Sequence, residues 1–218
     1  FHPTSKDGVP SIANGKPVLT LVLAGNVGPA MWEAFSAGRD PMTDLLDDWS
    51  QGVLCPVAKL YGGKALFPFH KPYLPFQRWA QRAEACHPSP LGLFIHAKHG
   101  LWHGYRGALT FAERLALPDT GTHLSPCNAC SEKPCLNTCP VGAFVPLKGG
   151  RESVTANYDI PNCVQHLQTL AGEDCMQLGC RARRACPEGK AARYLPEQAQ
   201  FHMRAFLKCA SLQKSPNG

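Results

Sequence analysis

The stretch PCNACSEKPCLNTCP, residues 126–140, holds four of the chain's eleven cysteines. Four more follow at Cys163, Cys175, Cys180 and Cys186, so eight cysteines fall within 60 residues. Disulfides that stabilise a secreted scaffold would be spread more evenly, and a chain of 218 residues has little need of them. The clustering therefore favours bound metal over disulfides.

The first group has the spacing Cys127-x2-Cys130-x4-Cys135-x3-Cys139-Pro140. Bacterial two-cluster ferredoxins use C-x2-C-x2-C-x3-C-P, in which the fourth cysteine binds the other cluster. This chain keeps the first gap, the last gap and the proline, and its middle gap is two residues longer. The proline disfavours helical geometry at Cys139, so that the sulfur can point toward a neighbouring cluster.

The second group has the spacing Cys163-x11-Cys175-x4-Cys180-x5-Cys186 and ends, like the first, in Cys-Pro-x-Gly. The two groups therefore resemble a degenerate internal repeat. With the ligands crossed as in two-cluster ferredoxins, the pattern predicts two [4Fe-4S] clusters with four thiolates each. One set is Cys127, Cys130, Cys135 and Cys186, and the other is Cys139, Cys163, Cys175 and Cys180.

Structural zinc is the main alternative, because zinc also binds sets of four cysteines. Zinc fingers and ribbons usually pair two short C-x2-C knuckles, whereas this region has one, and both of its groups end in Cys-Pro. Iron–sulfur is the favoured interpretation, and a zinc-stabilised binding module stays open. Cys55, Cys86 and Cys209 lie outside both sets, and each is predicted to be a small buried hydrophobic side chain.

The first 120 residues alternate between strand and helix patterns. Strands are expected at Val18–Ala24, Ala65–Phe69 and Leu91–His96, and helices at Ala30–Ala37, within Pro41–Tyr61 and at Phe76–Cys86. A turn at residues 98–100 is predicted to join Leu91–His96 to Leu101–Phe111 as a hairpin. From Ser125 onward, Cys, Pro, Gly and charged residues replace this periodicity. We therefore expect an α+β protein, with an α/β domain at 1–120 and a ferredoxin-like two-cluster domain at 121–218 that ends in a helical tail.

The order of these parts resembles that of epoxyqueuosine reductase and the reductive dehalogenases. The resemblance is carried by QRWAQRA at residues 77–83, by LGLFIHAKHGLWHGYRGALTF at residues 91–111, and by the cysteine region at residues 127–187. It implies a reduced nitroreductase-like, cobalamin-binding domain ahead of the two-cluster domain. Epoxyqueuosine reductases carry an acidic catalytic residue just before the first of these segments. Residues 70–75, HKPYLP, contain no carboxylate, which argues against reduction of a tRNA epoxide.

Aromatic and basic residues crowd the expected hairpin. Trp102, His103, Tyr105 and Arg106 are candidates for a cofactor-binding face, where rings stack and His or Arg make polar contacts. The other interpretation is a packed hairpin whose polar groups are bonded within the protein or solvated. Both stay open.

The chain has a net charge of +6, and Arg181, Arg183, Arg184, Lys190 and Arg193 gather around Cys186. This basic stretch either docks an acidic redox partner, offsets the charge of the clusters or is a solvated face. It lacks the interleaved aromatic residues that stack on bases, which argues against nucleic acid. No apolar run reaches the ~20 residues that span a bilayer and no signal peptide is visible, so we expect a cytoplasmic protein without a membrane partner.

Three functions follow, and the first is favoured. The chain is an iron–sulfur protein that relays single electrons through its two clusters, or a cobalamin- or flavin-dependent reductase that its clusters supply with electrons, or a zinc-stabilised binding module. The first needs no acid–base residues, because burial, hydrogen bonds to sulfur and local charge set cluster potentials.

Overall fold

The computed structural model describes residues 1–12, 15–37, 45–119, 121, 123–146 and 156–212. It combines short helices with antiparallel strands, which confirms a mixed α+β architecture. The chain forms two compact units, and each contains two separate segments. The first unit consists of Phe1–Cys86 and His103–His123, and the second of His87–Trp102 and Leu124–Gly218. Residues 87–102 thus belong with the cysteine region, although they precede the expected boundary at residue 120.

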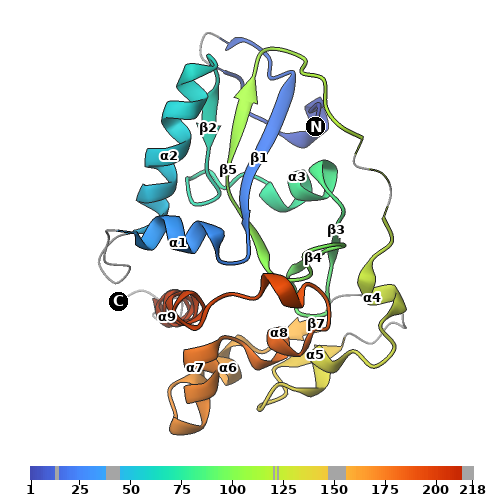
Figure 1. Cartoon of the computed structure of the whole chain (residues 1–218), viewed down its shortest axis with the longest axis vertical. Coiled ribbons are helices and arrows are strands. Elements are labelled where there is room, and N and C mark those ends of the chain that lie inside the picture. The colour runs from blue at the N-terminus through green and yellow to red at the C-terminus, as the bar shows by residue number, and fades with distance from the viewer. Residues whose placement is uncertain (13–14, 38–44, 120, 122, 147–155, 213–218) are drawn as a thin grey trace. The chain divides into compact units, whose positions relative to one another are not determined.

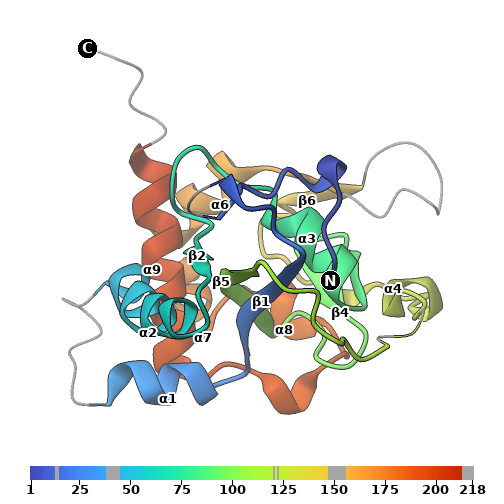
Figure 2. The ribbon, with the colours of Figure 1, turned by 90° about the horizontal axis from the view of Figure 1, so that it is seen from above.

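The first unit is built on a three-stranded sheet in the order β1-β5-β2. Helices α1 and α2 lie on one side of this sheet and α3 on the other (Figures 1 and 2). Its elements are a 3-10 turn (Ser5–Asp7), β1 (Thr20–Val27), α1 (Ala30–Ser36), α2 (Leu46–Leu60), β2 (Lys64–Leu66), α3 (Phe76–Ala83) and β5 (His103–Phe111).

The α3 side of the sheet forms the core of this unit. Trp79 is wholly buried there, in a cluster with Leu21 of β1 and Phe76. Burying a side chain such as Leu21 contributes roughly 1.5–3 kcal/mol. The Trp79 Nε1 donates to the backbone oxygen of Asp7 (2.8 Å), and the Asp7 carboxylate accepts hydrogen bonds from Arg82 (2.6 Å). The N-terminal segment is thereby tied to α3.

The second unit consists of short elements around the cysteines. Helix α9 packs beside α6 and α7, as both views show (Figures 1 and 2). Its elements are β3 (Cys86–Pro88), β4 (Phe94–His96), α4 (Pro126–Ala129), α5 (Pro134–Asn137), β6 (Phe144–Pro146), β7 (Ala156–Tyr158), α6 (Ile160–Leu167), a 3-10 turn (Leu170–Gly172), α7 (Glu173–Leu178), α8 (Arg181–Ala185), a second 3-10 turn (Lys190–Ala192) and α9 (Pro196–Leu212).

The turn at His99-Gly100 packs backbone against backbone on the loop that follows Cys186. A Cβ atom on Gly100 would lie 2.3 Å from the Glu188 oxygen, and one on Gly189 would lie 2.1 Å from the His99 oxygen. Both glycines also have positive φ angles, 58° and 68°. These positions need glycine for space and for conformation, and the close approach fixes the loop that carries Cys186.

Several expected elements are present with shifted ends. The strand expected at Val18–Ala24 is β1, and the helix expected at Phe76–Cys86 is α3. Within Pro41–Tyr61 a helix runs from Leu46 to Leu60, and residues 41–44 lie outside the described part of the chain. No helix in the described part of the chain combines the length and hydrophobicity required to span a membrane.

The predicted hairpin between Leu91–His96 and Leu101–Phe111 is wrong. The turn forms, and it is closed by hydrogen bonds between His96 and Gly100 (2.8 and 2.9 Å). Beyond it, β5 pairs with β1 and β2, while β4 pairs with β3. Strand β1 pairs with β5 along its whole length, from Thr20↔Phe111 to Val27↔His103. This pairing forms more backbone hydrogen bonds than the three-residue β4 could form with β5.

Candidate metal centres

The structure brings the eight cysteines together as two sets of four, and both sets lie in the second unit. In the first set, Cys127 lies in α4, Cys130 follows α4, Cys135 lies in α5 and Cys186 follows α8. All four line one small cavity of about 20 Å³. Pro126 and Pro134 begin the two short helices. At the first position of a helix the backbone N–H has no partner within the helix, so its absence in proline costs nothing, and the fixed φ angle of proline is already helical.

The second set surrounds a larger cavity of about 400 Å³. It contains Cys139, Cys163 of α6, Cys175 of α7 and Cys180 at the start of α8. Cys139 thus leaves its sequence neighbours for the second set, and Cys186 joins the first set. This is the grouping that the crossed pattern predicts.

The repeated Cys-Pro-x-Gly endings also share a backbone conformation. Gly142 and Gly189 each stand three residues after the crossing cysteine, and their φ angles are 59° and 68°. In both copies a left-handed glycine turns the chain after the cysteine and its proline. The two Cys-Pro-x-Gly endings therefore share a left-handed glycine.

The thiols of each set influence one another. Burial raises the pKa of the Cys135 thiol to about 11, and other cysteines of its set add to this rise. In the second set, burial raises the pKa of Cys163 and of Cys180, with Cys175 adding to both rises. Thiolates this close repel each other, and bound metal cations would relieve the repulsion.

Hydrogen-bond donors approach the sulfurs from the surrounding chain. The backbone nitrogen of Ala143 donates to the Cys139 Sγ (3.3 Å), and the Tyr158 hydroxyl bonds to the Cys163 thiol. The backbone nitrogens of Ala182 and Arg183 donate hydrogen bonds to the Cys180 sulfur. Such donors stabilise negative charge on sulfur, and they are one means by which proteins adjust iron–sulfur clusters.

The second cavity also contains an unsatisfied polar atom. The His166 Nε2 is buried and has no hydrogen-bond partner among the described residues, and His166 lines this cavity with the four cysteines. Buried polar groups normally have partners. Four thiols and a cavity of this size together fit a bound cluster.

The first set fits a cluster in the number and type of its ligands, but its space is narrow. A volume of about 20 Å³ holds about one water molecule. Binding a cluster there would require this cavity to widen. Coupling between metal binding and local folding is common at cysteine sites.

Among the described residues, no group of three or more His, Cys, Asp and Glu side chains is placed to hold a single metal ion. A tetrahedral zinc site needs four sulfurs at about 2.3 Å from one ion. A four-iron cluster makes a weaker demand on the apoprotein, because each cysteine binds a different iron atom and the sulfurs stay further apart. The described geometry therefore gives no support to a preformed zinc site.

The residues proposed for a cofactor face divide between the two units, and the three in the first unit lie in two environments. Arg106 lines a cavity between β1 and α2. The Tyr105 hydroxyl lies 3.2 Å from the Cys86 Sγ, and the His103 Nε2 lies 3.6 Å from the same sulfur. Trp102 belongs to the second unit, where its ring packs on the Arg183 guanidinium (4.5 Å). The shared face predicted from their spacing depended on the hairpin, which does not form.

The three remaining cysteines have different environments. Cys86 is buried, as predicted, and burial raises the pKa of its thiol. Cys55 and Cys209 are exposed, which corrects the prediction that they are buried. Cys55 lies on the outer face of α2 and Cys209 near the end of α9.

Most of the basic stretch is engaged within the protein. Arg181 and Arg184 both pair with Asp174, and Arg183 donates to the Leu101 backbone oxygen (3.1 Å). The Arg193 guanidinium donates to the Arg184 oxygen (2.6 Å). These arginines hold α8 in place between Cys180 and Cys186, so their charge does not by itself indicate a docking face.

Sequence reasoning did not single out Tyr158 and His166 as parts of the second site. Each stands near Cys163 in sequence, five residues before it and three after it. The position of His166, one helical turn after Cys163, was a signal that could have indicated it.

Comparison with known proteins adds nothing to this assignment: no family model, no curated protein and no solved structure matches the chain.

Proposed function

We propose that this chain is an electron-transfer protein that binds two [4Fe-4S] clusters in its second unit. The observation that carries the proposal is the grouping of eight cysteines into two sets of four, each around its own cavity. The exchange of Cys139 and Cys186 between the sets is the arrangement of two-cluster ferredoxins. A ferredoxin-like organisation of this unit is part of the proposal.

The residues have separate roles in this proposal. When bound, each cluster supplies a centre that gains and loses one electron. The eight thiolates bind the iron, and the backbone nitrogens near Cys139 and Cys180 stabilise charge on sulfur. Cys180 and Cys186 flank helix α8 at its two ends, so one short helix joins the two sites through its backbone. A rigid connection of this kind keeps the distance between two redox centres constant.

The partner we propose is an acidic redox protein. The net charge of +6 favours association with acidic surfaces. With most of the arginines near Cys186 bonded internally, Lys190 and the Lys133 beside the first cavity are the cations best placed to meet a partner. A reductase function would need a cofactor-binding face in the first unit, and the residues predicted for that face are dispersed.

A reductive titration tests the proposal. Protein reconstituted with iron and sulfide without oxygen should absorb broadly at about 400 nm. Stepwise addition of dithionite should bleach this band and take up about two electrons per chain. The reduced protein should then pass both electrons to an added one-electron acceptor. A chain that binds iron but takes up no electrons would contradict the proposed function.

A further inference from the structure

Helix α2 has two faces that lack charge, and one of them packs on the sheet. Ser50 and Ala58 are buried on the sheet side. A second row of side chains, which we call the apolar row, follows the helix at spacings of four, three and four residues and consists of Trp49, Val53, Pro56 and Leu60. This is the spacing of the seam of a coiled coil. Val53 leaves 44% of its surface exposed and Leu60 leaves 77%, so the apolar row offers a surface to a second helix.

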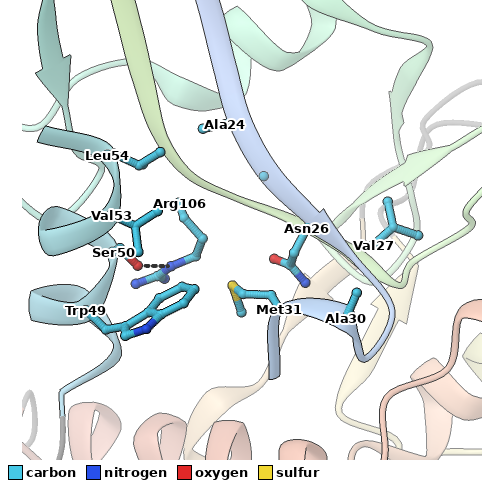
Figure 3. Close-up of a pocket in the computed structure, with 11 residues that line it drawn as sticks. Ala24, Asn26, Val27, Ala30, Met31, Trp49, Ser50, Val53, Leu54 and Arg106 are labelled. Carbon is cyan, nitrogen blue, oxygen red and sulfur yellow. Dashed lines mark hydrogen bonds between the residues drawn. The ribbon is translucent and has the colours of Figure 1, made fainter. Parts of the chain in front are cut away.

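A cavity of about 520 Å³ adjoins the apolar row, and it is the cavity that Arg106 lines. Figure 3 shows Trp49, Val53 and Met31 of α1 around its open space. Helix α2 packs on β5 and β2, and the cavity lies beside it at the end of the third strand, β1. Val27 of β1 leaves 38% of its surface exposed there. A helix in this position would extend the cover that α2 gives to the sheet, and covering apolar surface is favourable.

Arg106 holds α2 in the position that presents the apolar row. Ala24 of β1 pairs with Gly107 and Gly25 pairs with Tyr105, so a bulge leaves Arg106 out of the ladder. Bulges of this kind redirect side chains. The Arg106 Nε donates to the Ser50 hydroxyl (3.1 Å), and its guanidinium pairs with Asp47. Helix α2 is thereby fixed before any partner arrives, which lowers the entropy cost of association.

Two opposite charges stand beside the apolar row, at opposite ends of α2. Asp48 directly precedes Trp49, and Lys59 directly precedes Leu60. Both side chains are exposed. They are separated by three helical turns, so they lie on the same side of the helix and about 16 Å apart along it. An antiparallel pair of such helices brings Asp48 of each copy close to Lys59 of the other, whereas a parallel pair keeps them apart.

Gly52 lies on the same side of α2, between the two charges. A Cβ atom on Gly52 would meet nothing within 4 Å. Glycine inside a helix costs about 0.5–1 kcal/mol relative to alanine, and it allows another backbone to approach closely. The side of α2 that carries Asp48 and Lys59 therefore leaves room for a neighbouring helix.

We propose that two copies of this chain associate through α2, with the two helices side by side and antiparallel. Each apolar row packs on the other, so that Leu60 of one copy covers Trp49 of the other and Val53 lies near the centre. Asp48 of each copy meets Lys59 of the other. A two-fold axis makes every contact occur twice, as in other dimers built from one self-complementary surface.

Sedimentation equilibrium of the full chain in reducing buffer tests the proposal. We expect a reversible monomer–dimer equilibrium with a dissociation constant of roughly 10–100 µM, because a pair of short helices buries less area than a standard interface. The reductant prevents disulfides through Cys55, which is exposed on the same helix. A chain that remains monomeric at concentrations about tenfold above this range would overturn the proposal, because the apolar row would then need a different partner.

Reversing the charges tests the antiparallel arrangement. Asp48→Lys and Lys59→Asp each replace two attractive contacts of the dimer with two repulsive ones, and each should raise the dissociation constant about tenfold. The double variant restores the attraction with the signs exchanged, so its dissociation constant should return to within about threefold of the original. Glu113→Lys makes the same change of charge at an exposed residue outside α2 and is the matched control. A double variant that does not recover would contradict the antiparallel pair.

Replacing an exposed leucine tests the apolar row. Leu60→Gln should weaken association by about tenfold or more, because the dimer buries this side chain twice. The unfolding midpoint of the dilute monomer should not change, since Leu60 is 77% exposed. Leu170→Gln replaces a leucine of the second unit that is 92% exposed, and it should leave association unchanged. Equal association of the two variants would refute the proposed contact.

Iron content, measured on the same samples, separates this inference from the proposed function. Helix α2 and the cavity beside it belong to the first unit, so iron-loaded and iron-free chains should dimerise with the same dissociation constant. A dimer that forms only in iron-loaded protein would contradict association through α2. A dimer formed by a chain that cannot be loaded with iron would support it and contradict the clusters.

Discussion

The two cysteine sites differ in how the chain builds them. Three cysteines of the first site come from one loop between Cys127 and Cys135, and Cys186 completes the set. The four cysteines of the second site, Cys139, Cys163, Cys175 and Cys180, come from four different places in the second unit. A loop motif therefore defines the first site, and tertiary packing defines the second.

Their surroundings differ as well. The second cavity is larger, and Tyr158 and His166 reach it from neighbouring elements. Around the first site, Lys133 and Glu188 are the charged residues that line the cavity. Hydrogen bonds reach sulfurs of both sets. The second cavity is also lined by Arg181 and Arg183, whereas Lys133 and Glu188 at the first have opposite charges. Positive charge near a cluster favours its reduced, more negative state. We therefore expect the second cluster to have the higher reduction potential, so that electrons move from the first to the second.

Replacing ligands in pairs should have the largest effect. Cys139→Ser with Cys163→Ser removes two ligands of the second site alone, so iron should fall from about eight atoms per chain to about four. If Cys139 instead served its sequence neighbours, the same pair would damage both sites and leave almost no iron. Cys55→Ser with Cys209→Ser changes two exposed cysteines and is the matched control. Iron analysis after anaerobic reconstitution measures the outcome.

The two equivalent glycines should respond unequally to alanine. Gly189→Ala places a Cβ 2.1 Å from the His99 oxygen in a left-handed residue, whereas a Cβ on Gly142, also left-handed, meets nothing within 4 Å. We expect Gly142→Ala to cost about 1–2 kcal/mol from backbone strain alone. Gly189→Ala should cost about 2–5 kcal/mol, since overpacking adds to the strain.

Urea unfolding of the full chain measures this difference, and iron release to a chelator shows which site is affected. Gly189→Ala should loosen the first site before the second, because Gly189 fixes the loop after Cys186. Equal losses of stability in the two variants would mean that the close packing at Gly189 does not form in solution.

The hydroxyl of Tyr158 should affect the second cluster alone. Tyr158→Phe removes its hydrogen bond to the Cys163 sulfur. A net hydrogen bond of about 0.5–1.5 kcal/mol corresponds to roughly 20–60 mV for a one-electron couple, and its loss should lower the potential. Redox titration followed by electron paramagnetic resonance measures both clusters. Tyr61→Phe, exposed in the first unit, should change neither potential.

The smallest effect is expected at the start of α4. The Ser125 hydroxyl caps this helix by accepting from the Cys127 nitrogen (3.3 Å). Ser125→Ala should cost about 0.5–1 kcal/mol and speed iron release from the first site only. Chelator-release kinetics would show a faster phase worth about half of the iron, and acceleration of both phases would contradict separate sites.

The same contrast explains what could be predicted from sequence. Three cysteines of the first set lie in one segment, so the spacing Cys127-x2-Cys130-x4-Cys135 was enough to group them. Strand β1 and helix α3 were also predictable, because a long apolar run and a strongly helical stretch each determine their own structure. The grouping of Cys139 with Cys163 could be predicted only through the repeated Cys-Pro-x-Gly pattern.

Features that depend on distant partners could not be predicted in this way. The hairpin prediction is wrong because β5 pairs with β1, which lies far away in sequence. No local sequence signal shows that β1 competes with β4 for pairing with β5. The cavity at Arg106 depends on a bulge, which sequence periodicity does not reveal. Residue type predicts that Cys55 and Cys209 are buried, which is wrong because both lie on exposed helix faces.

Metal analysis of anaerobically purified protein, combined with electron paramagnetic resonance after reduction, tests the central claim most directly. We expect a brown protein with about eight iron atoms and as many sulfides per chain, and signals from two interacting [4Fe-4S] clusters. A colourless protein with stoichiometric zinc in the cysteine sites would contradict the account.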